Sequence, residues 1–299
     1  MKYIMMLLLI FTNVAFAQTR VIIPFPAGGG TDLVGRIIFN SIEQKTGHHF
    51  VIESIGGAGG DVGRHKAVRD NVLLFTPNSL LISAYINKSP ILPLDQFDPL
   101  VGIGAYPYLI SSHPTFKYNL RDLKSLQKGP INISSAGVAG ANHLIIFQLS
   151  KLLKFPVEPI PHKGTPDALL SVMSGMTPLM VSGIQGTHGY IESKRLRAVA
   201  VTTTFRDKTL PDVPTVQQST GVNFNYPGWF GVFAPKQYDK KTSSLVTAQI
   251  IDILKSKEVQ RKLDEQSVTI WNYDDKEFLK FLISDDRQWK TATQNVKFD

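Results

Sequence analysis

Residues 21–47 read VIIPFPAGGGTDLVGRIIFNSIEQKTG, and they join a short apolar run to an amphipathic pattern through three consecutive glycines. The apolar run predicts a β-strand at residues 20–23. A helix is predicted at residues 33–45, and its apolar face comprises Val34, Ile37, Ile38, Ser41 and Ile42. A helix N-terminus carries free N–H groups and a partial positive charge, and glycine lets an anion approach the backbone because it has no Cβ atom. We therefore expect the loop at residues 27–32 to bind an anion; the alternative is a tight strand–helix turn.

The same alternation of strand and helix continues along the chain. Further strands are predicted at residues 50–53, 72–76, 131–134, 157–160, 179–182 and 198–202, and further helices at residues 63–70, 143–153, 166–174, 242–266 and 275–290. Strands that alternate with helices predict an α/β fold in which helices cover both faces of a parallel sheet.

The pattern stops in the middle of the chain and then restarts, which predicts two α/β domains. No low-complexity linker separates them, so we expect β-rich runs near residues 101–110 and 229–234 to cross between the domains. On this prediction the first domain comprises residues 18–103 and 228–299, and the second domain comprises residues 104–227.

The first residues predict a secretory signal peptide. Lys2 precedes an almost wholly apolar run at residues 4–11, and Ala15-Phe16-Ala17 has the small-x-small pattern of a cleavage site. The run is too short to span a bilayer as a helix, and the alternative to a signal peptide is a buried N-terminal helix. We expect cleavage after Ala17 and export of the protein to a periplasm.

The composition of the 299-residue chain excludes several kinds of site. The chain contains no cysteine, which rules out disulfides, zinc sites with cysteine ligands and a thiol nucleophile. The formal net charge is +8, but the basic residues are scattered rather than clustered, so we expect no nucleic-acid partner. A modest positive charge suits small anionic ligands, and it equally suits solubility alone.

A second glycine-rich loop, SSAGVAGANHL at residues 134–144, also lies between a predicted strand and a predicted helix. Ligands of open α/β sheets bind beyond the carboxyl ends of the strands, so we expect this loop and the first one to face each other across a cleft. The alternative for the second loop taken alone is an ordinary turn.

The glycine-rich loops carry no nucleotide-binding motif. A phosphate-binding loop would end in Gly-Lys-Ser/Thr, and none of them does. A dinucleotide fingerprint, Gly-x-Gly-x-x-Gly, needs a third glycine three residues after the second. Leu33 occupies that position after Gly30, and Val62 occupies it after Gly59, so both loops lack the motif. A carboxylate is therefore the simpler candidate for the anion.

The sequence contains no catalytic or metal-binding motif. The seven histidines form no ligand pair at metal-site spacing, and no Gly-x-Ser-x-Gly motif occurs. His143 falls in the first turn of a predicted helix, where we expect a buried structural role. We therefore predict no catalytic residue, no metal and no cofactor, so that the protein is not an enzyme.

Five segments, in this order, resemble the extracytoplasmic solute receptors of tripartite tricarboxylate transporters, the Bug-type proteins. They are PFPAGGGTD at residues 24–32, VIESIGGAGGDVG at 51–63, PHKGTPDALLSVMSG at 161–175, LRAVAVTTTFRDKTLPDVPTVQQSTG at 196–221 and WFGVFAP at 229–235. The resemblance covers nearly the whole chain after residue 17. It implies a type II periplasmic-binding-protein fold, with two α/β domains around a hinged cleft.

The resemblance also implies that both strand–helix loops hold a ligand carboxylate through backbone N–H groups and ordered water, and that Phe25 walls the pocket. The ligand-binding residues expected on this basis are Phe25, Ala27, Gly28, Gly29, Gly30, Thr31, Asp32, Asn78, Ser79, Ser135, Gly137, Val138, Ala139, Gly140, Asn142 and Ser182.

The chain departs from the family pattern at three of these positions. Ala139 replaces the second glycine of the second loop, and Gly140 replaces a hydroxyl residue. Ser182 stands where an aspartate is common. An acid there would suit an amino-bearing ligand, so we expect a mono-, di- or tricarboxylate without an amino group.

The leading hypothesis for function is a monomeric periplasmic receptor that captures a small carboxylate and delivers it, by transient contact, to membrane permease subunits. A second hypothesis is a binding module that signals to a membrane sensor kinase. A third is a secreted hydrolase or transferase that uses the same cleft, and it lacks any nucleophile–base motif.

Overall fold

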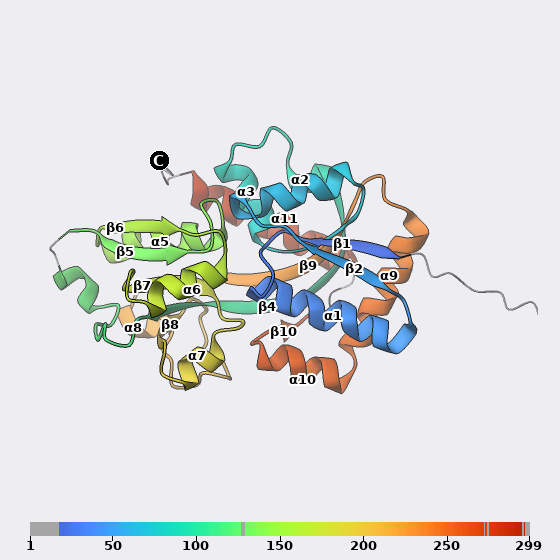
Figure 1. Ribbon diagram of the computed structural model, residues 1–299. Coiled ribbons are helices and arrows are strands. Elements are labelled where there is room, and N and C mark those ends of the chain that lie inside the picture. The colour runs from blue at the N-terminus through green and yellow to red at the C-terminus, as the bar shows by residue number, and fades with distance from the viewer. Residues whose placement is uncertain (1–17, 127–128, 272, 274, 295, 297–299) are drawn as a thin grey trace, which may run out of the picture.

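The structure is a computed structural model that describes residues 18–126, 129–271, 273, 275–294 and 296. The predicted signal peptide at residues 1–17 lies outside the described residues, so it stays a prediction. The described chain forms two lobes, which lie at the right and at the left of Figure 1.

The first lobe, at the right of Figure 1, combines the N-terminal and C-terminal parts of the chain. Its strands are β1 (Thr19–Ile23), β2 (Phe50–Ser54), β3 (Leu73–Pro77) and β10 (Thr269–Ile270). Its helices are α1 (Gly30–Thr46), α2 (Asp61–Arg69), α3 (Ser79–Ile86), α4 (Pro93–Gln96), α9 (Lys240–Leu254), α10 (Lys257–Glu265) and α11 (Asp275–Thr293), with a 3-10 turn, η1 (Ala58–Gly60). β1 pairs in parallel with β2 and with β3, as the alternation of strand and helix predicts.

The second lobe is built in the same way from the middle of the chain. Its strands are β5 (Ile131–Ser135), β6 (Val157–Pro161), β7 (Leu179–Gly183) and β8 (Arg197–Val201). Its helices are α5 (Ala141–Leu153), α6 (Thr165–Met173), α7 (His188–Glu192) and α8 (Val216–Thr220), with a 3-10 turn, η2 (Asp122–Leu126). β5 pairs in parallel with β6 and with β7, so the predicted α/β class is confirmed for both lobes.

Two long antiparallel strands, β4 (Phe97–Ser112) and β9 (Pro227–Pro235), run side by side between the lobes (Figure 1). The first part of β4 pairs with β9 and β10, and its last part pairs with β7 and β8. β9 pairs in addition with β3. The domain boundaries at residues 103/104 and 227/228 stay a prediction. They are supported by the change along β4 from pairing with strands of the first lobe to pairing with strands of the second lobe.

The helix α1 shows how the sequence positions the first glycine loop. Val34, Ile38 and Ile42 are fully buried on one face, and burying an aliphatic side chain stabilises the fold by about 1.5–3 kcal/mol. The helix begins at Gly30, three residues before the predicted start at Leu33, because the apolar periodicity does not extend into its polar first turn. For the same reason α5 begins at Ala141 rather than at the predicted His143. Both helix N-termini therefore lie within the glycine-rich loops.

A buried carboxylate joins the last helix to the crossing strands. Asp285 of α11 accepts hydrogen bonds from the indole N–H groups of Trp229 on β9, at 2.7 Å, and of Trp289, at 2.9 Å. Asp285 is only 9% exposed. Burial raises the pKa of this carboxyl to about 6, and the two indole donors only partly counteract the effect.

The raised pKa of Asp285 predicts a pH-dependent stability. Between about pH 4 and pH 6 the folded state holds a proton that the unfolded state has released, so the free energy of unfolding falls as the pH rises, by up to about 3 kcal/mol. The variant Asp285→Asn keeps an acceptor for the indoles but does not titrate. We expect denaturant unfolding of the two proteins to give curves that diverge across this window, with the wild type losing stability relative to the variant. Parallel curves would contradict the assignment.

Candidate functional site

A cavity lies between the two lobes, against the crossing strands. The space between atoms at this cavity, including its mouth, is about 430 Å³. Its lining comes from the first lobe, the second lobe and both crossing strands: Phe25, Gly30, Thr31, Pro77, Ser79, Tyr106, Tyr108, Ala136, Gly140, Asn142, Thr165, Gly183, Gln185 and Phe230.

Four helices begin at this cavity. Gly30 of α1, Ser79 of α3 and Thr165 of α6 are first helical residues, and Gly140 is the N-cap residue of α5. In the part of the chain that the structure describes, none of these four N-termini receives a hydrogen bond from a side-chain cap. The side chain of Asp239, in contrast, caps α9.

The first backbone N–H groups of these helices are free to bind a ligand. Among the described residues, the N–H groups of Gly30, Thr31, Ser79, Asn142 and Thr165 have no hydrogen-bond partner. Such N–H groups and the helix dipole stabilise a negative charge by about 0.3–1 kcal/mol per helix, and by up to about 2 kcal/mol in partly buried sites. Their convergence gives the cavity the donors that an anion would require.

Two side chains add donors to the same cavity. The hydroxyl of Ser79 and the amide nitrogen of Gln185 are buried, and neither has a partner among the described residues. Ser79 is 3% exposed and Gln185 is 2% exposed, and both residues line the cavity. A buried donor without a partner costs about 1–3 kcal/mol, which a bound acceptor would recover.

The phenols of the cavity are neutral. Tyr108 donates a hydrogen bond to Asn78 Oδ1 at 2.7 Å, and Tyr106 donates to the hydroxyl oxygen of Tyr108 at 3.3 Å. Burial raises the pKa of both tyrosines above the ordinary value. Because no lining residue is charged, the cavity offers only neutral donors and helix N-termini to a ligand.

The carboxylate of Asp32 organises the first loop and does not line the cavity. It accepts hydrogen bonds from the N–H of Gly28 at 2.9 Å, from Arg36 Nε at 2.9 Å and from the hydroxyl of Ser54 at 2.7 Å. Burial alone would raise the pKa of this carboxyl, but the three hydrogen bonds outweigh burial and lower it. The N–H of Gly28 is thus already occupied, so the first loop presents the N–H groups of Gly30 and Thr31 instead.

The predicted ligand-binding residues do not all lie together. Phe25, Gly30, Thr31, Ser79, Gly140 and Asn142 line the cavity between the lobes. Gly28 lies in an adjoining hollow of about 650 Å³, and Gly137 and Val138 lie in another of about 640 Å³, both including open space at the surface. The lining of these three spaces does not include Ala27, Gly29, Asp32, Asn78, Ser135, Ala139 or Ser182.

Ser182 is fully buried in β7, opposite Leu109 of β4, and its hydroxyl has no partner among the described residues. The next residue, Gly183, lines the cavity in its place. The contact of Ser182 with the ligand therefore stays a prediction. The cavity lacks an acidic side chain because none of its lining residues is aspartate or glutamate, whichever residue stands at position 182.

Sequence reasoning missed much of the lining. The missed residues are Pro77, Tyr106, Tyr108, Ala136, Thr165, Gly183, Gln185 and Phe230. Ala136 lies in the second glycine loop, Thr165 and Gln185 follow strands, and the other five residues lie on strands. The pairing of β9 with β3 and β4, and of β4 with β7, brings those five strand residues to the cavity. The rule that ligands bind beyond the carboxyl ends of strands could have indicated Gln185, which follows β7.

His143 has the buried structural position that the sequence predicts. It is 5% exposed, and its Nδ1 lies 3.1 Å from the hydroxyl of Ser135. Burial lowers the pKa of His143 to about 4, which keeps the ring neutral at ordinary pH. Within the described residues, no group of histidine, aspartate and glutamate side chains could hold a metal ion.

Glycines allow the two lobes to touch through their backbones. A Cβ atom added to Gly59 would lie 2.5 Å from the carbonyl carbon of Ala139, and one added to Gly30 would lie 2.8 Å from Cβ of Gln185. In both cases the neighbour belongs to the opposite lobe. Glycine is therefore needed at these positions for close approach of the lobes as well as for access of the ligand.

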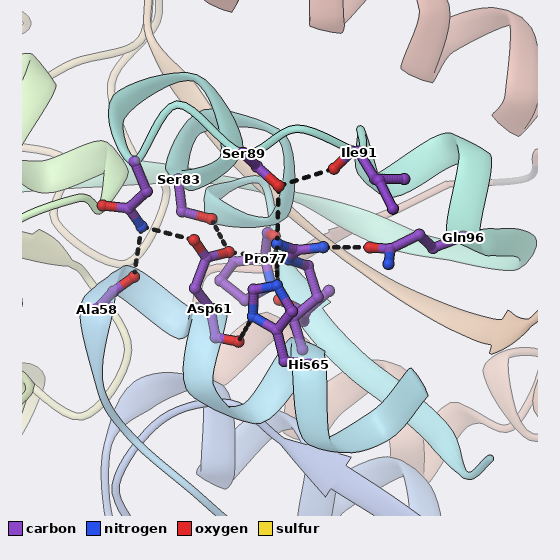
Figure 2. A network of polar contacts seen from close by, with 11 residues as sticks. Ala58, Asp61, His65, Pro77, Ser83, Ser89, Ile91 and Gln96 are labelled. Atoms are coloured by element: carbon purple, nitrogen blue, oxygen red, sulfur yellow. Dashed lines mark hydrogen bonds and ion pairs between the residues drawn. The ribbon is translucent and has the colours of Figure 1, made fainter. Parts of the chain in front are cut away.

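A buried polar network supports the loop that carries Gly59 (Figure 2). Asp61 accepts hydrogen bonds from Arg64 Nε at 2.9 Å and from the hydroxyl of Ser83 at 3.0 Å. Its second oxygen accepts from Asn87 Nδ2 at 2.6 Å, and the same amide donates to the carbonyl of Ala58 at 3.3 Å. The network ties the loop to α2 and α3, so this contact surface belongs to the rigid body of the first lobe.

Two lobes joined by crossing strands around a cavity for an anion define a solute-binding protein. Residues 34–298 match the tripartite tricarboxylate transporter family receptor, TctC. The chain belongs to this family. Within the described residues, no helix combines the length and the apolar character that crossing a membrane requires.

Individual relatives agree with this assignment. Protein BugT of Bordetella pertussis is 27% identical over 263 residues, which cover 84% of this chain and 80% of BugT. A solved periplasmic transporter is 26% identical, with a TM-score of 0.88 over 94% of this chain and 98% of its own. MatC from Rhodopseudomonas palustris, solved with bound malate, is 22% identical, with a TM-score of 0.84 over 92% of this chain and 98% of its own. The predicted type II periplasmic-binding-protein fold and the family resemblance are confirmed.

The lobe contact at Gly164 predicts a variant that binds ligand poorly without losing its fold. Gly164 has a φ of 173°, which any residue can adopt, but an added Cβ would lie 2.6 Å from Pro26 Cγ of the first lobe. We expect Gly164→Val to hold the lobes apart, raising the radius of gyration in X-ray scattering and weakening carboxylate binding by about tenfold or more. Gly189→Val is the control, because a Cβ there meets nothing within 4 Å. If Gly164→Val has the radius of gyration and the carboxylate affinity of the wild type, the contact between Gly164 and Pro26 does not hold the lobes closed.

Proposed function

We propose that the protein captures a small organic carboxylate in the cavity between its lobes and delivers it to the permease of a tripartite tricarboxylate transporter. The observation that carries the proposal is the convergence of four uncapped helix N-termini with the unpartnered donors of Ser79 and Gln185. An ionised carboxylate only accepts hydrogen bonds, so it can satisfy these donors together.

The energetics favour a carboxylate over a neutral or cationic ligand. A hydrogen bond to a charged acceptor contributes about 1.5–3 kcal/mol, about twice as much as a bond between neutral groups. An ammonium group would have no partner, because no acidic side chain lines the cavity. The malate held by MatC, a protein of similar fold, agrees with a carboxylate that lacks an amino group.

The cellular setting follows from the family and from the first residues of the sequence. The receptor would be exported by its signal peptide, cleaved after Ala17, and would act as a monomer that contacts the permease subunits transiently. The comparisons lend no support to signalling through a sensor kinase, and the matched family is one of transport receptors rather than of enzymes.

Removing the buried hydroxyl of Ser79 tests the proposed donor set. We expect Ser79→Ala to lose one charge-assisted hydrogen bond, which weakens binding about 10- to 100-fold. Isothermal titration calorimetry with acetate, L-malate, citrate and L-glutamate would first identify the carboxylate that binds the wild type most tightly. The same titration would then be repeated with the variant.

Ser111→Ala is the matched control for this experiment. The hydroxyl of Ser111 is also buried without a partner among the described residues, but Ser111 lies on β4 away from the cavity lining. We expect Ser111→Ala to bind like the wild type. Equal losses in both variants, or binding of glutamate in preference to the three amino-free carboxylates, would contradict the proposal.

A further inference from the structure

One side chain of the cavity lining is fixed as a hydrogen-bond acceptor. Asn142 lies in the first turn of α5 and lines the cavity. Its Nδ2 donates to the backbone carbonyl of Val181 on β7 at 3.2 Å. A carbonyl oxygen only accepts hydrogen bonds, so this bond sets the orientation of the amide. A Cβ atom added to Gly140 would lie 3.9 Å from Asn142 Oδ1, so this oxygen lies beside another residue of the lining.

The oxygen Oδ1 of Asn142 has no hydrogen-bond partner among the described residues. The hydroxyl groups of Thr31 and Thr165 in the same lining can rotate and donate to an anion, but Oδ1 carries no hydrogen to donate. A carboxylate oxygen placed against Oδ1 would meet a second acceptor. Once a ligand displaces water from the cavity, Oδ1 therefore has a partner only where the ligand itself supplies a hydrogen.

The donors of the cavity exceed what a single carboxylate can accept. Within the described part of the chain, five backbone N–H groups and two side-chain donors of the lining are free. The two oxygens of one ionised carboxylate offer about four acceptor sites. The ligand that fits this cavity therefore carries a further acceptor besides one carboxylate, in addition to the donor that Oδ1 requires.

A hydroxyl group meets both conditions at once. It donates one hydrogen, which Asn142 Oδ1 can accept, and its oxygen accepts from the remaining donors. An ammonium group would also donate to Oδ1, but it accepts nothing, and its charge would meet no acidic side chain in the lining. A second carboxylate adds acceptors and leaves Oδ1 without a donor. A hydroxyl is therefore expected both in a ligand with one carboxylate and in a ligand with several.

We propose that the ligand is a 2-hydroxycarboxylate and that Asn142 determines this specificity by accepting a hydrogen bond from the hydroxyl. The free backbone N–H and Oδ1 belong to the same residue, so they can bind a carboxylate and a hydroxyl on adjacent carbon atoms. The proposal rests on the carboxylate-receptor function and names the ligand class of the same site. It sets no limit on the length of the ligand or on the number of its carboxylates.

Matched pairs of ligands test the proposal on the wild-type protein. Calorimetric titration compares acetate with glycolate, succinate with L- and D-malate, and tricarballylate with citrate. We expect a hydroxy acid to bind about three- to tenfold more tightly than its partner without the hydroxyl, because it gains one hydrogen bond. If no hydroxy acid binds more tightly than its partner, the hydroxyl specificity is overturned while the receptor function stands. Folded protein that binds none of these acids would overturn the receptor function and the specificity with it.

The variant Asn142→Ala then tests the residue itself. It removes the acceptor but keeps the backbone N–H and suits a helix, so we expect the preferred hydroxy acid and its partner to bind with about equal affinity. A purely structural role of Asn142 would instead weaken the binding of both acids by the same factor and keep the ratio of their affinities. A folded variant that keeps the wild-type ratio would overturn the assignment of Asn142.

Two further variants complete the experiment. Asn132→Ala, at an exposed site on β5 outside the cavity lining, is the matched control and should keep the wild-type ratio. If Asn142→Ala does not fold, Asn142→Leu removes the same acceptor with a smaller change in volume. Loss of the ratio in Asn132→Ala as well as in the Asn142 variant would also contradict the assignment.

Discussion

The first N–H groups of a helix have no acceptor within the helix, and this protein gathers several such groups at one cavity. The first turns of α1, α3, α5 and α6 all contribute, although the helices come from two lobes and from distant parts of the sequence. Side-chain caps would satisfy the same groups and remove the site. These four described N-termini lack such caps, as those of α2, α4, α7 and α10 also do, so the feature on which the proposed ligand binding depends is their convergence at one cavity.

The crossing strands β4 and β9 connect this site to the rest of the fold. They hold the lobes together through a continuous sheet, and they also supply the aromatic end of the cavity through Tyr106 and Phe230. β9 is fixed in turn by the indole of Trp229, which donates to the buried carboxylate of Asp285 on α11. The strands on which a hinge motion would depend are thus the same strands that line one end of the cavity.

The sequence was sufficient to predict the alternation of strands and helices and the position of both glycine loops. The helices α3, α4, α7 and α8 were not predicted, and the helical stretch predicted at residues 242–266 is divided into α9 and α10. Apolar periodicity is a local signal, so it located β1, α1, β5 and α5 to within a few residues. It placed the start of α1 at Leu33 rather than at Gly30, because the first turn of a helix carries no apolar stripe.

The site was only partly predictable, for a physical reason. Phe25, Gly30 and Thr31 lie in a recognisable loop, whereas Tyr106 and Gln185 reach the cavity only through the pairing of β4 with strands of both lobes. The sequence also did not indicate that Asp32 would turn back to the N–H of Gly28 and so withdraw one predicted donor from the ligand.

The most direct test of the central claim is a crystal structure of the protein grown with acetate, at a resolution that locates the carboxylate oxygens. The account predicts electron density for the anion between the lobes, with its oxygens within hydrogen-bond distance of backbone N–H groups from at least one helix N-terminus in each lobe, and of Ser79 Oγ or Gln185 Nε2. An acetate that binds only at surface lysines or arginines, while the cavity between closed lobes holds nothing but water, would contradict it.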